Sequence, residues 1–90
     1  MIFKAMNVRK PSLFEIEQAE TWDTWEKDVS DFDWHYAENE TCYILEGAAK
    51  VVDMNGNSIE FSAGDWVSFP KGLKCRWSVS APIKKKYLFY

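Results

Sequence analysis

The chain has 90 residues, which is enough for one domain with a modest core, and 17% of its residues are aromatic. The formal net charge of −3 gives no basic field to hold phosphates, so nucleic acid is excluded as an expected partner. No apolar segment is long enough to cross a bilayer, and residues 1–11 lack the apolar stretch of a secretory signal. We therefore expect a cytoplasmic protein that does not bind membranes, with its two cysteines as free thiols.

The first third of the chain predicts one edge strand and one short helix. Residues 1–9 alternate loosely and stop at Lys10-Pro11, as an edge strand does. Residues 12–19 begin with Ser12 and carry Glu15 three positions later, which is the capping-box signature of a helix start. Strand-forming residues dominate from Trp22 onward.

The remainder of the chain predicts short strands separated by turns. We expect strands at residues 31–36, 41–45 continued through 48–52, 58–61, 66–69, 74–79 and 84–90. Asn55-Gly56 is a strong hairpin signal, since both central residues of that turn need positive φ. Three consecutive lysines, Lys84 to Lys86, are expected on a solvated edge of the last strand. Strands at this spacing predict one all-β domain over residues 1–90, a barrel or a sandwich.

Side chains on a strand alternate between its two faces, so parity groups the polar residues. Asp33 and His35 share one face, as do Glu40, Cys42 and Ile44 on the next strand, and Cys75, Trp77 and Val79 on a later one. If all three faces point inward, the pocket they form contains Asp33, His35, Glu40, Cys42, Cys75 and Trp77. Carboxylates and imidazoles are costly to bury without partners, so such a cluster would indicate a site.

Two segments of the chain carry a family resemblance. The first runs from Glu40 through an apolar strand to Gly47, and the second places Gly64, Pro70 and Gly72 at fixed spacing. Their order resembles the two signature motifs of the cupins, most closely the small cupins grouped with ureidoglycine aminohydrolases and ethanolamine-utilisation cupins. The resemblance covers about residues 30–80 and implies a jelly-roll-like β-barrel with a short N-terminal helix.

The resemblance also implies metal ligands at four positions. His35 and Glu40 match the cupin pattern, whereas Asp33 and Cys75 replace histidines. A set of His35, Glu40 and Cys75, with Asp33 as an optional fourth ligand, would suit Zn, Fe, Ni or Mn. Cys42 falls where the family has an apolar residue and is expected to pack, although a disulfide with Cys75 stays open if their strands are neighbours.

Four functions remain open at this point, one of them a thiol-redox role for Cys42 and Cys75, although the chain has no C-x-x-C pair to support it. The first is a metal-free cupin whose pocket binds a small polar metabolite through hydrogen bonds and aromatic stacking. The second is a metal-dependent enzyme acting on a small nitrogen-containing metabolite, as the aminohydrolase resemblance implies. The third is an interaction module, since the aromatic tail Tyr87-Leu88-Phe89-Tyr90 would suit a homodimer contact. Of these, we favour the small-molecule-binding cupin.

Overall fold

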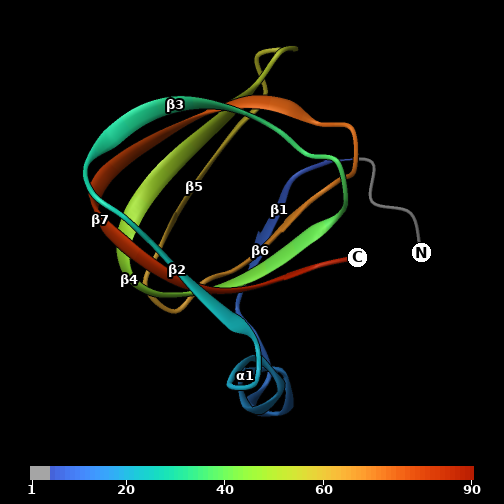
Figure 1. Ribbon diagram of the computed structural model, residues 1–90, viewed down its shortest axis with the longest axis vertical. Helices are drawn as coiled ribbons and strands as arrows, with labels where there is room; N and C mark the ends of the chain where they lie inside the picture. The colour runs from blue at the N-terminus through green and yellow to red at the C-terminus, as the bar shows by residue number, and fades with distance from the viewer. Residues whose placement is uncertain (1–4) are drawn as a thin grey trace.

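A computed structural model describes residues 5–90 and shows one antiparallel sheet that curls around an interior, with a short helix outside it (Figure 1). The strands are β1 (Asn7–Arg9), β2 (Asp23–Lys27), β3 (Ser30–His35), β4 (Glu40–Asp53), β5 (Ser58–Ser62), β6 (Trp66–Phe69) and β7 (Lys74–Phe89). Their order is β1-β6-β4-β7-β2, with β3 paired to β7 and β5 paired to β4. The all-β prediction is confirmed, but the sheet is not closed into the predicted barrel.

One strand is longer than the sequence predicts, and another is continuous as predicted. The two strands expected within residues 74–90 are one continuous strand, β7, which pairs with β2, β3 and β4. Strand β4 is also continuous, and its register with β7 shifts between Ile44 and Ala49, around Gly47 at a φ of +89°. Register shifts of this kind let a strand bend without ending, so β4 and β7 can curve together around the interior.

Other differences lie at the amino-terminal side. The sequence did not predict β2 as a separate strand, and this strand takes its hydrogen bonds from β7. Residues 1–4 of the predicted first strand lie outside the described residues, and the described part is β1, paired with β6. In the part of the chain that the structure describes, no helix has the length and apolar character needed to cross a membrane.

The helix α1 (Leu13–Ala19) begins as its sequence predicts. The hydroxyl of Ser12 accepts a hydrogen bond from the backbone N–H of Glu15 at 3.2 Å, and the Glu15 carboxylate accepts one from the Ser12 N–H at 2.9 Å. This reciprocal pair is the capping box, which satisfies two backbone donors that a helix start would otherwise leave free. The capping-box prediction is confirmed.

Glu15 also joins the helix to β1, because its carboxylate accepts a hydrogen bond from the Arg9 guanidinium at 2.8 Å. The Arg9 hydrogen bond, followed by that of the Ser12 backbone, lowers the pKa of Glu15 to about 2. A lowered pKa contributes stability that is complete above the ordinary pKa of 4.5 and is lost as the pH falls toward 2.

We expect Arg9→Gln to raise the pKa of Glu15 toward its ordinary range. An NMR titration of the Glu15 side-chain carbonyl between pH 2 and pH 6 in the parent and the variant measures this change. Because the pair is on the surface, its loss should cost under about 1 kcal/mol at neutral pH. A Glu15 titration that is the same in both proteins would contradict the pairing.

The interior of the sheet is filled mainly by aromatic and branched apolar side chains. The largest fully buried members are Trp77, Tyr36, Phe69, Ile44, Ile83, Val51 and Val67. Phe69 stacks on Tyr36 with a centroid separation of 4.9 Å, and Phe61 meets Trp77 edge-on at 5.4 Å. Pairs in these geometries stabilise the core beyond the area they bury.

Candidate functional site

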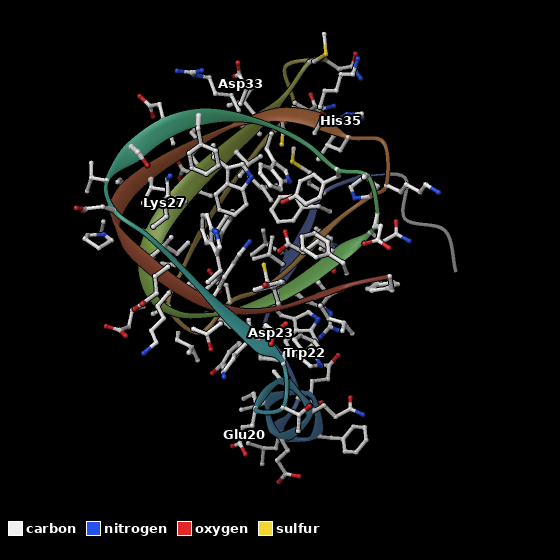
Figure 2. All side chains as sticks on the ribbon, in the orientation of Figure 1. Glu20, Trp22, Asp23, Lys27, Asp33 and His35 are labelled. Carbon is white, nitrogen blue, oxygen red and sulfur yellow. The ribbon has the colours of Figure 1, made fainter. Side chains whose placement is uncertain are left out.

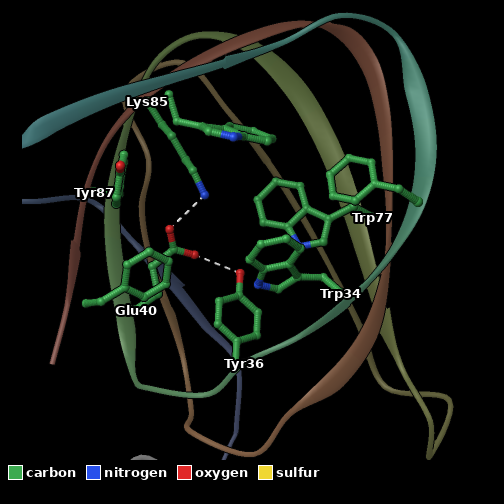
Figure 3. A pocket seen from close by; sticks show the side chains of 9 residues that line it. Trp34, Tyr36, Glu40, Trp77, Lys85 and Tyr87 are labelled. Atoms are coloured by element: carbon green, nitrogen blue, oxygen red, sulfur yellow. Dashed lines mark hydrogen bonds and ion pairs between the residues drawn. The ribbon is translucent and has the colours of Figure 1, made fainter.

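A cavity of about 200 Å³ opens into this aromatic interior, between the face of β7 and the strands that flank it (Figure 3). Its lining comes from β2, β3 and the residue that follows it, the start of β4, and β7. It consists of Trp25, Phe32, Trp34, Tyr36, Glu40, Trp77, Lys85, Tyr87 and Phe89. Seven of these nine side chains are aromatic, and Glu40 and Lys85 are the charged ones. A concave apolar site with a few convergent polar groups is typical of small-molecule binding.

Three polar side chains of the cavity form one hydrogen-bonded triad. The Lys85 ammonium donates to Oε2 of Glu40 at 2.8 Å, and the Tyr36 hydroxyl donates to Oε1 of the same carboxylate at 2.7 Å. Glu40 and Tyr36 are each 1% exposed and Lys85 is 4% exposed. The charges are therefore paired inside the protein, which is the condition under which buried charges are tolerated.

Lys85 is also held by aromatic rings. Its Nζ lies 4.7 Å from the ring centroid of Trp25 and 4.6 Å from that of Trp77, both within cation–π range. The expected solvated position is therefore wrong for this lysine. Strand alternation turns Lys85 inward with Ile83, while Lys84 and Lys86 on either side are only partly buried.

The Tyr36 hydroxyl is fixed as a hydrogen-bond donor. Burial, followed by the nearby Glu40 carboxylate, raises the pKa of Tyr36 well above its ordinary value. The phenol therefore keeps its proton and can donate it to Glu40 throughout the neutral range. Its ring is held by stacking on Phe69, so the hydroxyl is rigidly placed.

The ring of Trp77 forms one wall of the cavity. It stacks on Phe32 with a centroid separation of 5.9 Å and an interplanar angle of 11°, and it meets Trp25 edge-on at 6.0 Å. Its indole N–H has no hydrogen-bond acceptor among the described residues, so ring packing alone holds this side chain. Because Trp77 is packed closely against these two rings, it gives the cavity a rigid apolar wall.

The structure divides the residues that the sequence placed in one pocket between two places. Glu40 and Trp77 line the cavity, whereas Asp33, His35 and Cys75 line a second hollow outside it. Cys42 lies in the core, which Cys75 also joins. Both thiols are free, and burial raises the pKa of Cys42 to about 12 and that of Cys75 to about 11. The Cys75 thiol also donates to the backbone carbonyl of Trp34 at 3.7 Å.

Asp33 and His35 lie on the outer face of β3. The prediction that they face the interior is therefore wrong, because the side chains one position along the strand face it instead. Asp33 is paired with Arg76 at 2.9 Å, its side chain is 84% exposed, and it points away from the interior (Figure 2). His35 is exposed as well. The inward residues of this segment are the aromatic ones, Phe32, Trp34 and Tyr36, which line the cavity.

The residues present do not fit the metal centre that the cupin resemblance implies. Within residues 5–90, no group of three or more His, Cys, Asp and Glu side chains is placed to hold a metal ion. Glu40 already binds Lys85 and Tyr36, and His35 lies on the opposite face of the sheet from it. Metal binding stays a prediction for which this cavity offers no ligand set.

The aromatic tail, residues 87–90, is predicted to form a dimer contact, but only part of it lies on the surface. Tyr87 and Phe89 line the cavity, while Leu88 and Tyr90 are 42% and 50% exposed. The Tyr90 hydroxyl shares a hydrogen bond of 2.8 Å with the hydroxyl of Thr41 on β4. A dimer contact through this tail stays a prediction.

Sequence reasoning missed seven of the nine residues that line the cavity, among them Lys85, Tyr36 and Trp25. Tyr36 could have been found from the alternation of Phe32, Trp34 and Tyr36, which marks an inward face. Lys85 could have been found because it lies on the same face of its strand as Ile83. Trp25 had no such signal, because β2 joins the sheet only through β7.

Comparison with known proteins agrees with this fold. Residues 15–87 match the family model of the EutQ-like cupin domain, and no curated protein matches the chain. A DUF861-family protein from Thermotoga maritima is 45% identical with a TM-score of 0.91, over 94% of this chain and 99% of that one.

Two ethanolamine-utilisation proteins are more distant. The EutQ protein of Clostridium difficile is 26% identical with a TM-score of 0.70, over 92% of this chain and 67% of that one. A putative EutQ from Salmonella typhimurium is 19% identical with a TM-score of 0.69, over the whole of this chain and 76% of that one, and it supports the fold alone. The resemblance drawn from the motifs is confirmed, and the chain belongs to the EutQ-like cupin family.

Proposed function

We propose that this cupin binds a small, uncharged, ring-containing molecule in the cavity above the Glu40–Lys85–Tyr36 triad. The observation that carries the proposal is the combination of rigid aromatic walls with a single group of buried polar side chains. Aromatic walls favour a flat apolar body, and one polar cluster favours a ligand with one polar end.

The size of the cavity limits the ligand to about one ring. A cavity of about 150 Å³ is known to hold a benzene molecule, and this one has a volume of about 200 Å³. The additional space suits one small substituent. A larger ligand would have to extend past Trp34, which is 46% exposed at the edge of the site.

The triad determines which polar group a ligand can place beside it. Lys85 uses one ammonium proton for Glu40 and can donate another, and each Glu40 oxygen has accepted one hydrogen bond and can accept a second. A group that both accepts and donates, such as a carboxamide, would satisfy Lys85 and Glu40 together. Because the two charges of the triad cancel, a charged ligand would add an unpaired charge to a buried site.

A fragment screen by ligand-observed NMR tests the proposal. The probes are ring-sized carboxamides, beginning with benzamide, together with benzoate and benzylamine as charged counterparts. We expect benzamide to bind the parent protein better than either charged probe. We expect Trp34→Ala to weaken its affinity by about tenfold, because one stacked ring is removed from the wall.

The matched control is Phe14→Ala, which removes another exposed aromatic ring. Phe14 is 67% exposed on α1 and does not line the cavity, so its loss should leave binding unchanged. No binding by any neutral probe, or equal losses in the two variants, would contradict the proposal.

A further inference from the structure

Lys85 is the only primary amine among the nine residues that line the cavity. Its Nζ lies at the edge of the open space, between the Glu40 carboxylate and the rings of Trp25 and Trp77 (Figure 3). A lysine enclosed by apolar walls beside a proton acceptor is the arrangement in which an amine can act as a nucleophile toward carbonyl compounds. Non-covalent binding makes no use of this chemistry.

We propose that Lys85 forms a covalent imine with a ring-sized aldehyde or ketone bound in the cavity. This inference rests on the proposed function, since the carbonyl compound must first occupy the same aromatic site. The inference goes beyond that function because it assigns a covalent reaction to Nζ of Lys85, with neutral carbonyl compounds as the class of substrate.

Glu40 supplies the acceptor for the lysine proton. Its Oε2 is 2.8 Å from Nζ, so a proton can pass directly along the existing hydrogen bond. The transfer leaves Lys85 as a neutral amine, which is its nucleophilic form, and Glu40 as a carboxylic acid.

The reaction then balances within the site. The nitrogen lone pair attacks the carbonyl carbon, the C–N bond forms, and the π electron pair moves to the carbonyl oxygen. That oxygen takes the nitrogen's surplus proton, giving a neutral carbinolamine, and the proton on Glu40 then allows the hydroxyl to leave as water. The product is a protonated imine beside an ionised Glu40, so one cation has replaced another and the ion pair is restored.

Tyr36 is a positioning residue in this scheme. Its hydroxyl donates to Oε1 of Glu40 at 2.7 Å, which leaves Oε2 directed at Lys85. The aromatic walls place the carbonyl group next to the amine and exclude water that would hydrolyse the imine.

Reductive trapping tests the inference on the intact parent protein. The protein is incubated with benzaldehyde and sodium cyanoborohydride, and the modification rate of each lysine is measured by peptide mass mapping. We expect Lys85 to be modified at least about tenfold faster than the exposed Lys71 and Lys74, despite its burial, because the bound aldehyde is held beside it. We also expect benzamide to slow the modification of Lys85 and leave that of Lys71 unchanged.

The outcomes separate this inference from the proposed function. Faster modification of Lys85 with protection by benzamide supports both. If Lys85 reacts no faster than Lys71 and Lys74 while benzamide binds in the NMR screen, the imine is excluded and the binding function stands. If Lys85 reacts no faster and benzamide does not bind, both proposals fail.

Discussion

Lys85→Met is expected to destabilise the protein by about 3–5 kcal/mol, because it leaves the Glu40 carboxylate buried without its counter-ion. Methionine has nearly the volume of the lysine stem, so the apolar contacts with Trp25 and Trp77 are largely kept. Urea denaturation at neutral pH measures the change. The loss is a large share of the 5–15 kcal/mol that stabilises a typical domain.

Two further variants show whether the charge is the cause. Lys84→Met removes the neighbouring lysine, whose side chain is 40% exposed and 4.0 Å from Glu46, and should change stability by less than about 0.5 kcal/mol. The double variant Lys85→Met with Glu40→Gln should recover most of the loss, because no buried charge remains. A double variant as unstable as Lys85→Met alone would contradict this explanation.

Gly47→Ala is expected to destabilise the protein by more than about 3 kcal/mol, for two separate reasons. Gly47 has a φ of +89°, in the region that L residues rarely adopt. A Cβ at this position would also overlap the backbone oxygen of Pro82 and lie 2.7 Å from its carbonyl carbon and 2.8 Å from the oxygen of Ala81. Because these atoms belong to the backbone of β7, relief would require β4 and β7 to move apart.

Gly56→Ala is the matched control, since Gly56 has a φ of +85° but nothing lies within 4 Å of its added Cβ. Only the backbone strain applies there, and we expect a loss of about 1–2 kcal/mol. Thermal and urea unfolding of both variants measure the difference. Equal losses would mean that the close approach of β4 to Pro82 has no role in stability.

The sequence predicts the local parts of this fold well because their causes are local. The capping box at Ser12 and the hairpin at Asn55-Gly56 depend on residues a few positions apart, and both occur, but only Gly56 has the positive φ expected of both central residues of the turn. In the hairpin, the Asp53 carboxylate accepts hydrogen bonds from the backbone N–H groups of Asn55 and Asn57, both at 2.9 Å. Such turns need no distant partner in order to form.

The site was harder to predict because two patterns compete on β3. The family motif placed Asp33 and His35 inward, whereas hydrophobic alternation places Phe32, Trp34 and Tyr36 there. The aromatic residues occupy the interior because burying their large apolar surface is favourable and burying an unpaired carboxylate is costly. The aspartate consequently pairs with Arg76 in solvent.

Lys85 could not be assigned from composition, because a run of three lysines indicates solvent. Its inward position follows from alternation along β7, because Lys85 shares the parity of the buried Ile83. The lysines on either side obscured this signal.

Strand β7 also makes much of the sheet depend on contacts between distant parts of the chain. Strands β2 and β3 take their sheet partners from β7, so Asp23 pairs with Tyr87 and Ser30 with Val79, far along the chain in both cases. By contrast, the β4–β5 hairpin joins neighbouring segments and can form early. Closing the long loops that these pairings require costs entropy before any contact forms, so we expect the protein to fold slowly. Because β7 carries Trp77, Lys85, Tyr87 and Phe89, its docking is also the step that creates the cavity, and a ligand that fills the cavity would slow the undocking of this strand.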